Sequence, residues 1–371
     1  MPGAGVLAAA LFSGSLALWL CGTHLGVDSL SCSISDDAVV AAEEQPLAKA
    51  AVQRLDHYLA HSGSLATGRQ RYRCTSQWLT TDFLFETGGG GFQDTHSLRD
   101  WIFISEPAFQ GSFTEPEPLL AQNVLILGTD AVASTTGHGS VYWAKDLRGV
   151  PASRSRTLMR VADVYMAKRH DAKSAKIMWK FRLVDWADLL RRAGRQVLAP
   201  APLPEGVVRP PAHSHGGLAA LQSKSRVESA ALAALQEDWS GSAAASHWHG
   251  NLTFYGPTGM GLALSKDEYV QHILAPYRSA FVERGVSAEI LACEGCLCVA
   301  SGQLTGRGVG NWMGLNVVGK RVSIPFVHHF RVEETGALVR EGWLMIDHPA
   351  LFQQLGLDFW ALAAASEPHS L

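Results

Sequence analysis

Two acidic side chains near the C-terminus could do acid–base chemistry. Asp347 follows a predicted strand at 338–346, and Glu341 shares one face of that strand with Trp343, because alternate residues of a strand lie on the same face. A carboxylate held against apolar side chains has a raised pKa, which suits it to transfer protons near neutral pH. Asp347 has an alternative role. It also precedes a predicted short helix with Pro349 in its first turn, where an aspartate caps the helix.

Two adjacent histidines lie on the preceding predicted strand, at 321–332. His328 and His329 point to opposite faces, so at most one of them can enter a pocket on one side of the sheet. A histidine in such a pocket could donate a hydrogen bond to a carbonyl group or shuttle a proton. A strand histidine can equally be structural, and the pattern leaves open which of the two faces inward.

Cys293, Cys296 and Cys298 form the densest group of potential metal ligands. Zinc needs four ligands at suitable spacing, and no second pair of cysteines or histidines completes the set. Cys296 and Cys298 share a predicted strand face, where cysteine packs as a small hydrophobic residue. The glycines at 88–91 are not followed by Lys-Ser/Thr and are typical of a turn rather than of a phosphate loop. We therefore expect neither a metal nor a cofactor.

Aromatic side chains of the C-terminal half could line a pocket for a flat, apolar ligand. The same side chains could instead form the core of a small domain. The candidate pocket residues are Trp248, Tyr255, Tyr269, Trp312 and Trp343.

The two halves of the chain repeat one sequence pattern. When Pro107 is aligned with Pro276, an offset of 169 residues, the Thr-Gly-His-Gly at 136–139 falls on the Thr-Gly-Arg-Gly at 305–308 without a gap. His138 belongs to this repeated segment of the first half. Matches in the same order along both halves predict a tandem duplication.

The ends of the two halves match as well. Residues 185–194 and 347–356 have the same internal spacing, so that Asp185 corresponds to Asp347. The segment at 196–216 is rich in proline, which predicts an extended and exposed linker. The predicted organisation is an apolar N-terminal segment at 1–35, a first domain at 36–195, the linker at 196–216, a second domain at 217–360 and a tail at 361–371.

Each half places helices before a run of strands. In the second half, the spacing predicts a helix over 217–237, and a capping box formed by Ser265 and Glu268 opens another. Helices followed by antiparallel strands indicate an α+β fold, with a sheet curled around a helix. The predicted strands lie at 287–293, 296–304, 321–332 and 338–346.

Several short motifs occur together in the second half. They are Trp248; Gly256-Pro-Thr-Gly259; Ala275-Pro-Tyr277; Glu294-Gly295; Thr305-Gly-Arg-Gly308; Gly319-Lys-Arg-Val322; His329-Phe-Arg-Val332; Trp343-Leu-Met-Ile-Asp347; and Gln354-Leu-Gly356. In this combination, residues 217–357 resemble the SnoaL-like polyketide cyclase family of the NTF2-like superfold. The first half resembles the family more faintly, since it has four glycines at 88–91 in place of Gly256-Pro257 and lacks the Gln-Leu-Gly ending.

The resemblance implies two tandem cone-shaped α+β barrels, each with helices packed on a strongly curved antiparallel sheet and an apolar pocket between them. It also implies a cyclase, isomerase or dehydratase that acts without a cofactor on an apolar, carbonyl-containing, polyketide-like molecule. Asp347 is then the leading acid or base, with Glu341 and one of His328 and His329 beside it. Asp185 and His138 are the counterparts in the degenerate first domain.

The family resemblance has two further consequences. A fold does not fix a function, so the alternative is a non-catalytic module for small-molecule binding or assembly. Relatives commonly cover the outer face of the sheet by dimerising. A tandem chain can do this within itself, so we expect the two domains to pack as a pseudo-dimer.

Composition excludes several other classes of protein. The chain has 371 residues, of which 47% are hydrophobic and 18% charged, and a formal charge of −3, so nucleic acid is not an expected partner. The apolar run at 6–20 is shorter than a comfortable transmembrane helix and is typical of a signal-peptide core, although the first basic side chain is Lys49. Secretory or organelle entry is the favoured location, with a membrane anchor or a cytoplasmic protein as alternatives.

Overall fold

The computed structural model describes most of the chain after residue 45. The described residues are 46–58, 68–88, 96–105, 111–114, 125–205, 224–241, 245–333 and 338–366. They belong to one compact unit that starts at Val40, and the predicted signal segment at 1–35 lies outside them. In this part of the chain, no helix is long and apolar enough to cross a membrane.

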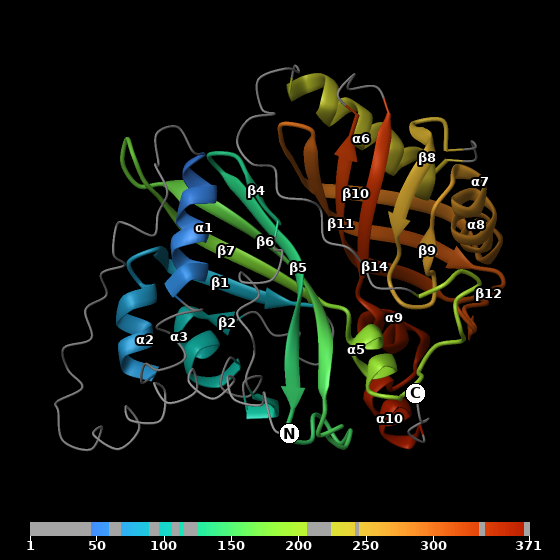
Figure 1. The fold of residues 1–371 in the computed structure, drawn as a ribbon, viewed down its shortest axis with the longest axis horizontal. Helices are drawn as coiled ribbons and strands as arrows, with labels where there is room; N and C mark the ends of the chain where they lie inside the picture. The colour runs from blue at the N-terminus through green and yellow to red at the C-terminus, as the bar shows by residue number, and fades with distance from the viewer. Residues whose placement is uncertain are drawn as a thin grey trace, which may run out of the picture. The chain divides into compact units, whose positions relative to one another are not determined.

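A first sheet is covered on one face by α1 (Leu47–Tyr58), which contacts β5, β6 and β7 (Figure 1). Shorter helical segments of this half are α2 (Gly68–Thr75), α3 (Leu98–Asp100), the π-helical turn η4 (Trp101–Ser105) and α5 (Trp186–Arg192). In spatial order the strands are β2 (His96–Ser97), β1 (Leu79–Thr87), β7 (Ala175–Val184), β6 (Arg156–Arg169), β5 (Val132–Trp143) and β3 (Phe113–Thr114), with β4 (Leu125–Gly128) also paired to β5.

A second sheet is covered by α6 (Lys224–Trp239), which contacts β10, β11, β14 and β15 (Figure 1). In spatial order its strands are β10 (Phe281–Glu294), β11 (Leu297–Gly308), β14 (Arg321–Val332), β15 (Val339–Ile346), β8 (Trp248–Tyr255) and β9 (Leu262–Ala263). The other elements are α7 (Lys266–Glu268), η6 (Tyr269–Leu274), α8 (Ala275–Ala280), the small ladder of β12 (Asn311–Trp312) and β13 (Leu315–Asn316), α9 (His348–Leu355) and α10 (Phe359–Ala365).

The two sheets have the same strand order. The spatial strand order β1-β7-β6-β5-β4 in the first sheet corresponds to the order β8-β15-β14-β11-β10 in the second sheet. Both sheets are mixed rather than purely antiparallel, because the first long strand of each half pairs parallel with the last one, β1 with β7 and β8 with β15. Strand β10 carries two register shifts, and such bulges bend a strand. The fold is therefore α+β with helices packed on curved sheets, as expected from the order of the elements.

The helix α6 forms because an apolar stripe repeats along it. Ala231 follows Val227 by four residues, Ala234 and Leu235 follow Ala231 by three and four, and all four are fully buried against the second sheet. Asp238 continues the same stripe and is also fully buried. A carboxylic acid therefore enters the interior of the second half on the apolar face of this helix.

The opposite faces of the two sheets contact each other through apolar side chains. Ala162, Val164 and Leu183 of the first sheet form one buried cluster with Val299 and Val327 of the second. Within this contact, the Ser134 hydroxyl and His329 Nε2 lie 2.8 Å apart in a buried hydrogen bond. At the border of the contact, Lys49 Nζ donates to Glu294 at 2.6 Å.

The predicted linker and the predicted tail differ from the exposed chain that composition suggested. In the described part of the predicted linker, Leu198 and Leu203 are buried in the large apolar core. The predicted tail overlaps α10, whose Trp360 packs edge-on against Trp186 at a ring distance of 5.3 Å. In both cases a few apolar side chains find a partner surface that proline content and terminal position do not reveal.

Candidate functional site

Asp347 caps the helix that follows it. The carboxylate Oδ1 accepts a hydrogen bond from the Ala350 amide at 2.9 Å, and the side chain is 2% exposed. Next to it lies Gly88 of the first half, where an added Cβ would come within 2.6 Å of Asp347 Oδ2. This is the helix-cap geometry that the sequence offered as an alternative to a catalytic acid, and the catalytic role of Asp347 stays a prediction.

Glu341 pairs with Arg331 on the neighbouring strand. The ion pair is 2.9 Å long, and both side chains are about a third exposed. Glu341 shares its strand face with Trp343 and Met345, as expected, and Met345 belongs to the buried cluster between the sheets. This is the face directed at the first sheet, so Glu341 does not meet α6.

The structure decides which histidine faces inward. His329 faces the first sheet and bonds to Ser134, whereas His328 lies under α6 among aromatic rings. The His328 ring stacks on Trp248 at 6.3 Å and meets the edge of Phe254 at 5.6 Å. Burial lowers the pKa of His329 to about 3 and that of His328 well below its usual value, so both rings are neutral at pH 7.

The predicted pocket aromatics divide into three groups. Trp248 and Tyr269 contact each other at 4.9 Å in the interior of the second half. Tyr255 and Trp343 stack on each other at 5.6 Å, away from that pair. Trp312 packs at 5.4 Å against the ring of Tyr277, which is also buried.

The interior of the second half holds a carboxylic acid that the sequence analysis did not single out. Asp238 Oδ2 accepts hydrogen bonds from Trp248 Nε1 at 2.9 Å and from the Tyr269 hydroxyl at 2.8 Å. Burial raises the pKa of Asp238 to about 7, and the two hydrogen bonds oppose that shift. The helical spacing of Asp238 from Leu235 and Ala234 is the signal that could have revealed it.

Several buried polar atoms of the second half have no hydrogen-bond partner among the described residues. They are Asp238 Oδ1, both ring nitrogens of His328 and Trp239 Nε1, and all are buried. A buried polar group without a hydrogen bond costs about 1–3 kcal/mol, so such groups are usually satisfied by water or by a ligand. The ring of Trp248 connects the set, since it bonds to Asp238 and stacks on His328.

The space beside His328 is closely filled. A Cβ added at Gly342, on the facing strand, would lie 2.6 Å from the Trp248 ring and 3.0 Å from His328 Nε2. Glycine at 342 therefore leaves the space that the Trp248 and His328 rings occupy. The interior is closely packed with aromatic rings and has unused hydrogen-bonding capacity.

The first half has a different interior. Asp163 forms ion pairs with Lys180 at 2.9 Å and with Arg182 at 2.7 Å, and Lys180 also donates to the Tyr165 hydroxyl at 3.1 Å. Burial alone would raise the pKa of Asp163, but the two cations hold it well below its usual value. Tyr165 reaches Asp56, whose pKa burial raises to about 6. This network satisfies its own charges.

Asp185, a predicted site residue of the first half, has other partners than this network. Asp185 caps α5 by accepting from the Asp188 amide at 3.1 Å, and it pairs with Arg160 at 3.1 Å. His138 lies on β5 opposite Arg160 of β6. Asp185 therefore repeats the helix-cap geometry of Asp347.

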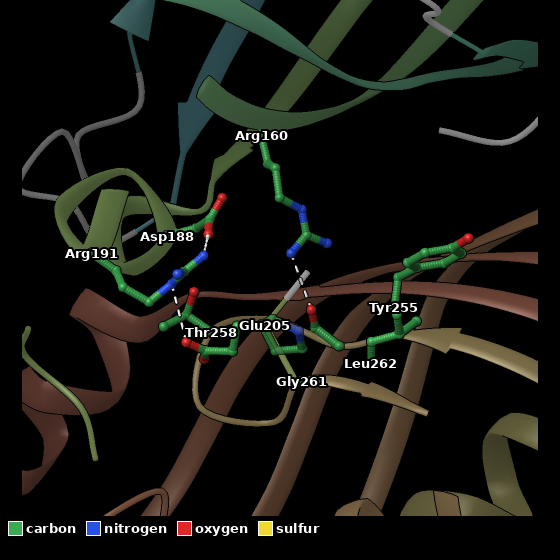
Figure 2. A pocket seen from close by; sticks show the side chains of 10 residues that line it. Arg160, Asp188, Arg191, Glu205, Tyr255, Thr258, Gly261 and Leu262 are labelled. Carbon is green, nitrogen blue, oxygen red and sulfur yellow. Dashed lines mark hydrogen bonds and ion pairs between the residues drawn. The ribbon is translucent and has the colours of Figure 1, made fainter. Parts of the chain in front are cut away.

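A pocket where the two halves meet is filled by paired charges (Figure 2). Arg160 donates to the Gly256 carbonyl at 3.0 Å, and Arg191 lies between Asp188 and Glu205. The pocket has a volume of about 20 Å³, which is room for about one water molecule. We assign it a structural role.

Two of the three clustered cysteines pair with each other. Cys293 and Cys298 are joined by a disulfide bond, and Cys296 is a free thiol. Within the residues that the structure describes, no group of three or more His, Cys, Asp or Glu side chains could hold a metal ion.

Comparison with known families finds a match in the second half. Residues 227–355 match the family described as SnoaL-like polyketide cyclase, so this segment is similar to a SnoaL-like domain. No curated protein matches the chain.

Solved structures similar to the chain each cover about a third of it. AclR from Streptomyces galilaeus has 20% identity and a TM-score of 0.32, covering 36% of this chain and 87% of AclR. TsrD from Streptomyces laurentii has 20% identity and a TM-score of 0.32, covering 36% of this chain and 98% of TsrD. A protein from Jannaschia sp. CCS1 named for the SnoaL-like polyketide cyclases has 18% identity and a TM-score of 0.32, and the match covers 36% of this chain and 94% of that protein.

The helix cap at Asp347 gives a first prediction. Asp347→Asn should leave the free energy of unfolding nearly unchanged, because asparagine caps a helix about as well as aspartate, whereas Asp347→Ala should lower it by about 1 kcal/mol. Chemical denaturation measures both values, and Asp358→Ala at the cap of α10 is the matched control. Equal losses in the asparagine and alanine variants would show that the charge of Asp347, rather than its cap, is what the fold requires.

The buried acid gives a second prediction. The pKa of Asp238 is 3.8 in the unfolded chain, and burial raises it to about 7 in the folded protein. Between these values the folded state holds a proton that the unfolded state has lost, so this residue's contribution to stability falls as the pH rises from about 4 to about 7. Asp238→Asn should remove that slope. Urea titrations of the wild-type chain and of Asp238→Asn at pH values from 4 to 7 measure their free energies of unfolding. If the two free energies differed by the same amount at every pH, the raised pKa would be contradicted.

Proposed function

We propose that the SnoaL-like domain binds an apolar small molecule in its aromatic interior, and that Asp238 exchanges a proton with a carbonyl-bearing ligand there. The observation that carries the proposal is the set of buried polar atoms without protein partners, Asp238 Oδ1, the His328 ring nitrogens and Trp239 Nε1, counted among the described residues. They offer one acid, one neutral imidazole and one indole donor to a molecule otherwise surrounded by aromatic rings. The predicted polyketide-like substrate has that character.

The environment of Asp238 suits proton transfer. With a pKa of about 7, the acid is present in both protonation states at neutral pH, which is the condition for efficient general acid–base catalysis. Trp248 and Tyr269 fix Oδ2, so that Oδ1 is the oxygen left to give or take the proton. Removing a proton next to a carbonyl group and returning it elsewhere is an isomerisation, and the step needs no cofactor.

The second candidate is a non-catalytic binding or assembly module. The close packing of the Trp248 ring against Gly342 favours this module, because it leaves little space for a ligand. The other predicted catalytic residues also have structural partners. Asp347 caps α9, Glu341 pairs with Arg331, and His329 bonds to Ser134. In this case Asp238 is a protonated structural acid that joins α6 to Trp248 and Tyr269.

Hydrogen–deuterium exchange into a probe ketone distinguishes the two functions. We expect the wild-type chain to accelerate α-proton exchange of 2-tetralone, an apolar bicyclic ketone, in deuterated buffer at pH 7. Asp238→Asn should lose roughly 10²-fold of that rate, the scale of a general acid–base contribution. Proton NMR of the probe measures the rate.

The controls separate binding from chemistry. Glu341→Gln, on the other face of β15, should keep the full rate, and His328→Leu should weaken binding of the probe as measured by its line width. Binding without accelerated exchange would favour the non-catalytic module. If the wild-type chain neither binds the probe nor retains an apolar molecule in native mass spectrometry, the ligand-binding proposal fails.

We also propose that the chain is a tandem duplication, with domains at 36–195 and 217–360, whose two modules pair through their sheet faces as a pseudo-dimer. The equal strand order supports the duplication, and the apolar cluster around Val164 and Val299 supports the pairing. The first module then has its own interior, which is filled by charges that satisfy one another.

The ion pair between Lys49 and Glu294 tests this pairing. Glu294→Lys should lower the free energy of unfolding by about 1.5–3 kcal/mol, because Glu294 accepts charge-assisted hydrogen bonds from Lys49 and the Gly128 amide. The swap of Lys49→Glu with Glu294→Lys should recover part of the loss, since it restores opposite charges but not the carboxylate at Gly128. Denaturation of the two single variants and the double variant measures the coupling. Strictly additive effects would contradict the contact.

A further inference from the structure

The second half carries an acceptor sequence for N-linked glycosylation, Asn251-Leu-Thr253. It lies on β8, which follows β15 toward the border of the second sheet (Figure 1). A sugar chain is bulky and polar, so it needs an asparagine at the surface. Asn251 is exposed, whereas Leu252 beside it is fully buried and anchors the strand to the core.

The acceptor sequence occupies an irregular stretch of the strand. Trp248 pairs with Val339 and Thr253 pairs with Glu341, and the register of the ladder shifts between these two pairs. On the other side of β8, the short strand β9 pairs with it only from Phe254 onward. The residues between Trp248 and Thr253 therefore bulge at the border of the sheet, where a regular central strand would bury or pair them.

A local turn fixes the direction of this bulge. His249 Nδ1 accepts a hydrogen bond from the backbone amide of Asn251 at 3.0 Å, and His249 Nε2 lies 3.3 Å from Glu333. A Cβ added at Gly250 would meet no atom within 4 Å, so the space beside the turn is open. Among the described residues, nothing bonds to the side-chain amide of Asn251, which leaves its nitrogen accessible.

Two further features agree with passage through the compartment where such sugars are added. The apolar run at 6–20 is typical of a signal-peptide core. Cys293 and Cys298 form a disulfide bond, and disulfides persist in oxidising compartments such as the lumen of the endoplasmic reticulum and are rare in the cytosol.

We propose that Asn251 is a site of N-linked glycosylation. The sugar donor is an oligosaccharide attached to a membrane lipid through a diphosphate. A bond forms between Asn251 Nδ2 and the first sugar carbon, the bond from that carbon to the diphosphate oxygen breaks, and Nδ2 loses one proton as the lipid diphosphate leaves. The Thr253 hydroxyl completes the acceptor.

A sugar at this position would cover the border of β8, where another strand could otherwise pair edge to edge. The modification involves neither Asp238 nor His328. It is therefore independent of the function proposed for the interior of the second half.

Cell-free translation of the full chain with endoplasmic-reticulum membranes tests the site. We expect a heavier product, which peptide N-glycosidase returns to the mass of the unmodified chain. Asn251→Gln and Thr253→Val should lose the heavier product, whereas Thr253→Ser should keep it, because serine also completes the acceptor. Asn311→Gln is the matched control, since it removes an exposed asparagine that is not followed by a serine or threonine two residues later. The sugar is added as the chain enters the membrane compartment, so the readout does not require each variant to fold.

Each outcome decides the proposal. Loss of the heavier product in Asn251→Gln and Thr253→Val, with its retention in Thr253→Ser and Asn311→Gln, supports the site. A wild-type chain that stays unmodified overturns it, as does a heavier product that survives Asn251→Gln. Mass spectrometry of the chain isolated from its natural source is the second measurement. A peptide with a sugar on Asn251 supports the site, and only the unmodified peptide overturns it.

Discussion

The buried contact between the two sheets decides where every side chain of the second sheet points. Because neighbouring residues of a strand face opposite ways, the bond between Ser134 and His329 turns His328 under α6. The same alternation on β15 directs Trp343 and Met345 to the first sheet and leaves Gly342 and Leu344 on the inner side. The chemical character of the interior is thus set by a contact on the other face of the sheet.

The two interiors treat buried charge in opposite ways. In the first half, Asp163 forms ion pairs with both Lys180 and Arg182, so its buried charge is stabilised without a ligand. In the second half, the Asp238 carboxylate accepts hydrogen bonds from the neutral groups of Trp248 and Tyr269, and burial raises its pKa to about 7 although Arg278 lies nearby. A group poised between two protonation states is more useful for chemistry than one locked in an ion pair. The functional proposal for the second half depends on this difference.

The carboxylates at the ends of the two sheets have a common role. Asp185 and Asp347 each follow the last long strand of their half and cap the helix that comes next. A cap at this point fixes the direction in which the chain leaves the sheet. The repeated pattern at the ends of the two halves is therefore explained by folding alone, and a catalytic role is not required to account for it.

The sequence by itself determined several elements of the second half and the order of helices before strands. Apolar spacing gave α6, the capping box gave α7 at Ser265, and alternation gave β14 at its observed bounds, because these signals are local. Other features were decided only by the tertiary structure, since they depend on which surfaces meet. The parallel pairing of β8 with β15, the inward turn of His328, and the hydrogen bonds of Asp238 with Trp248 and Tyr269 all join residues far apart in the chain. Alternation along a strand can state that two residues face opposite ways, but only packing against a second surface decides which of them faces in.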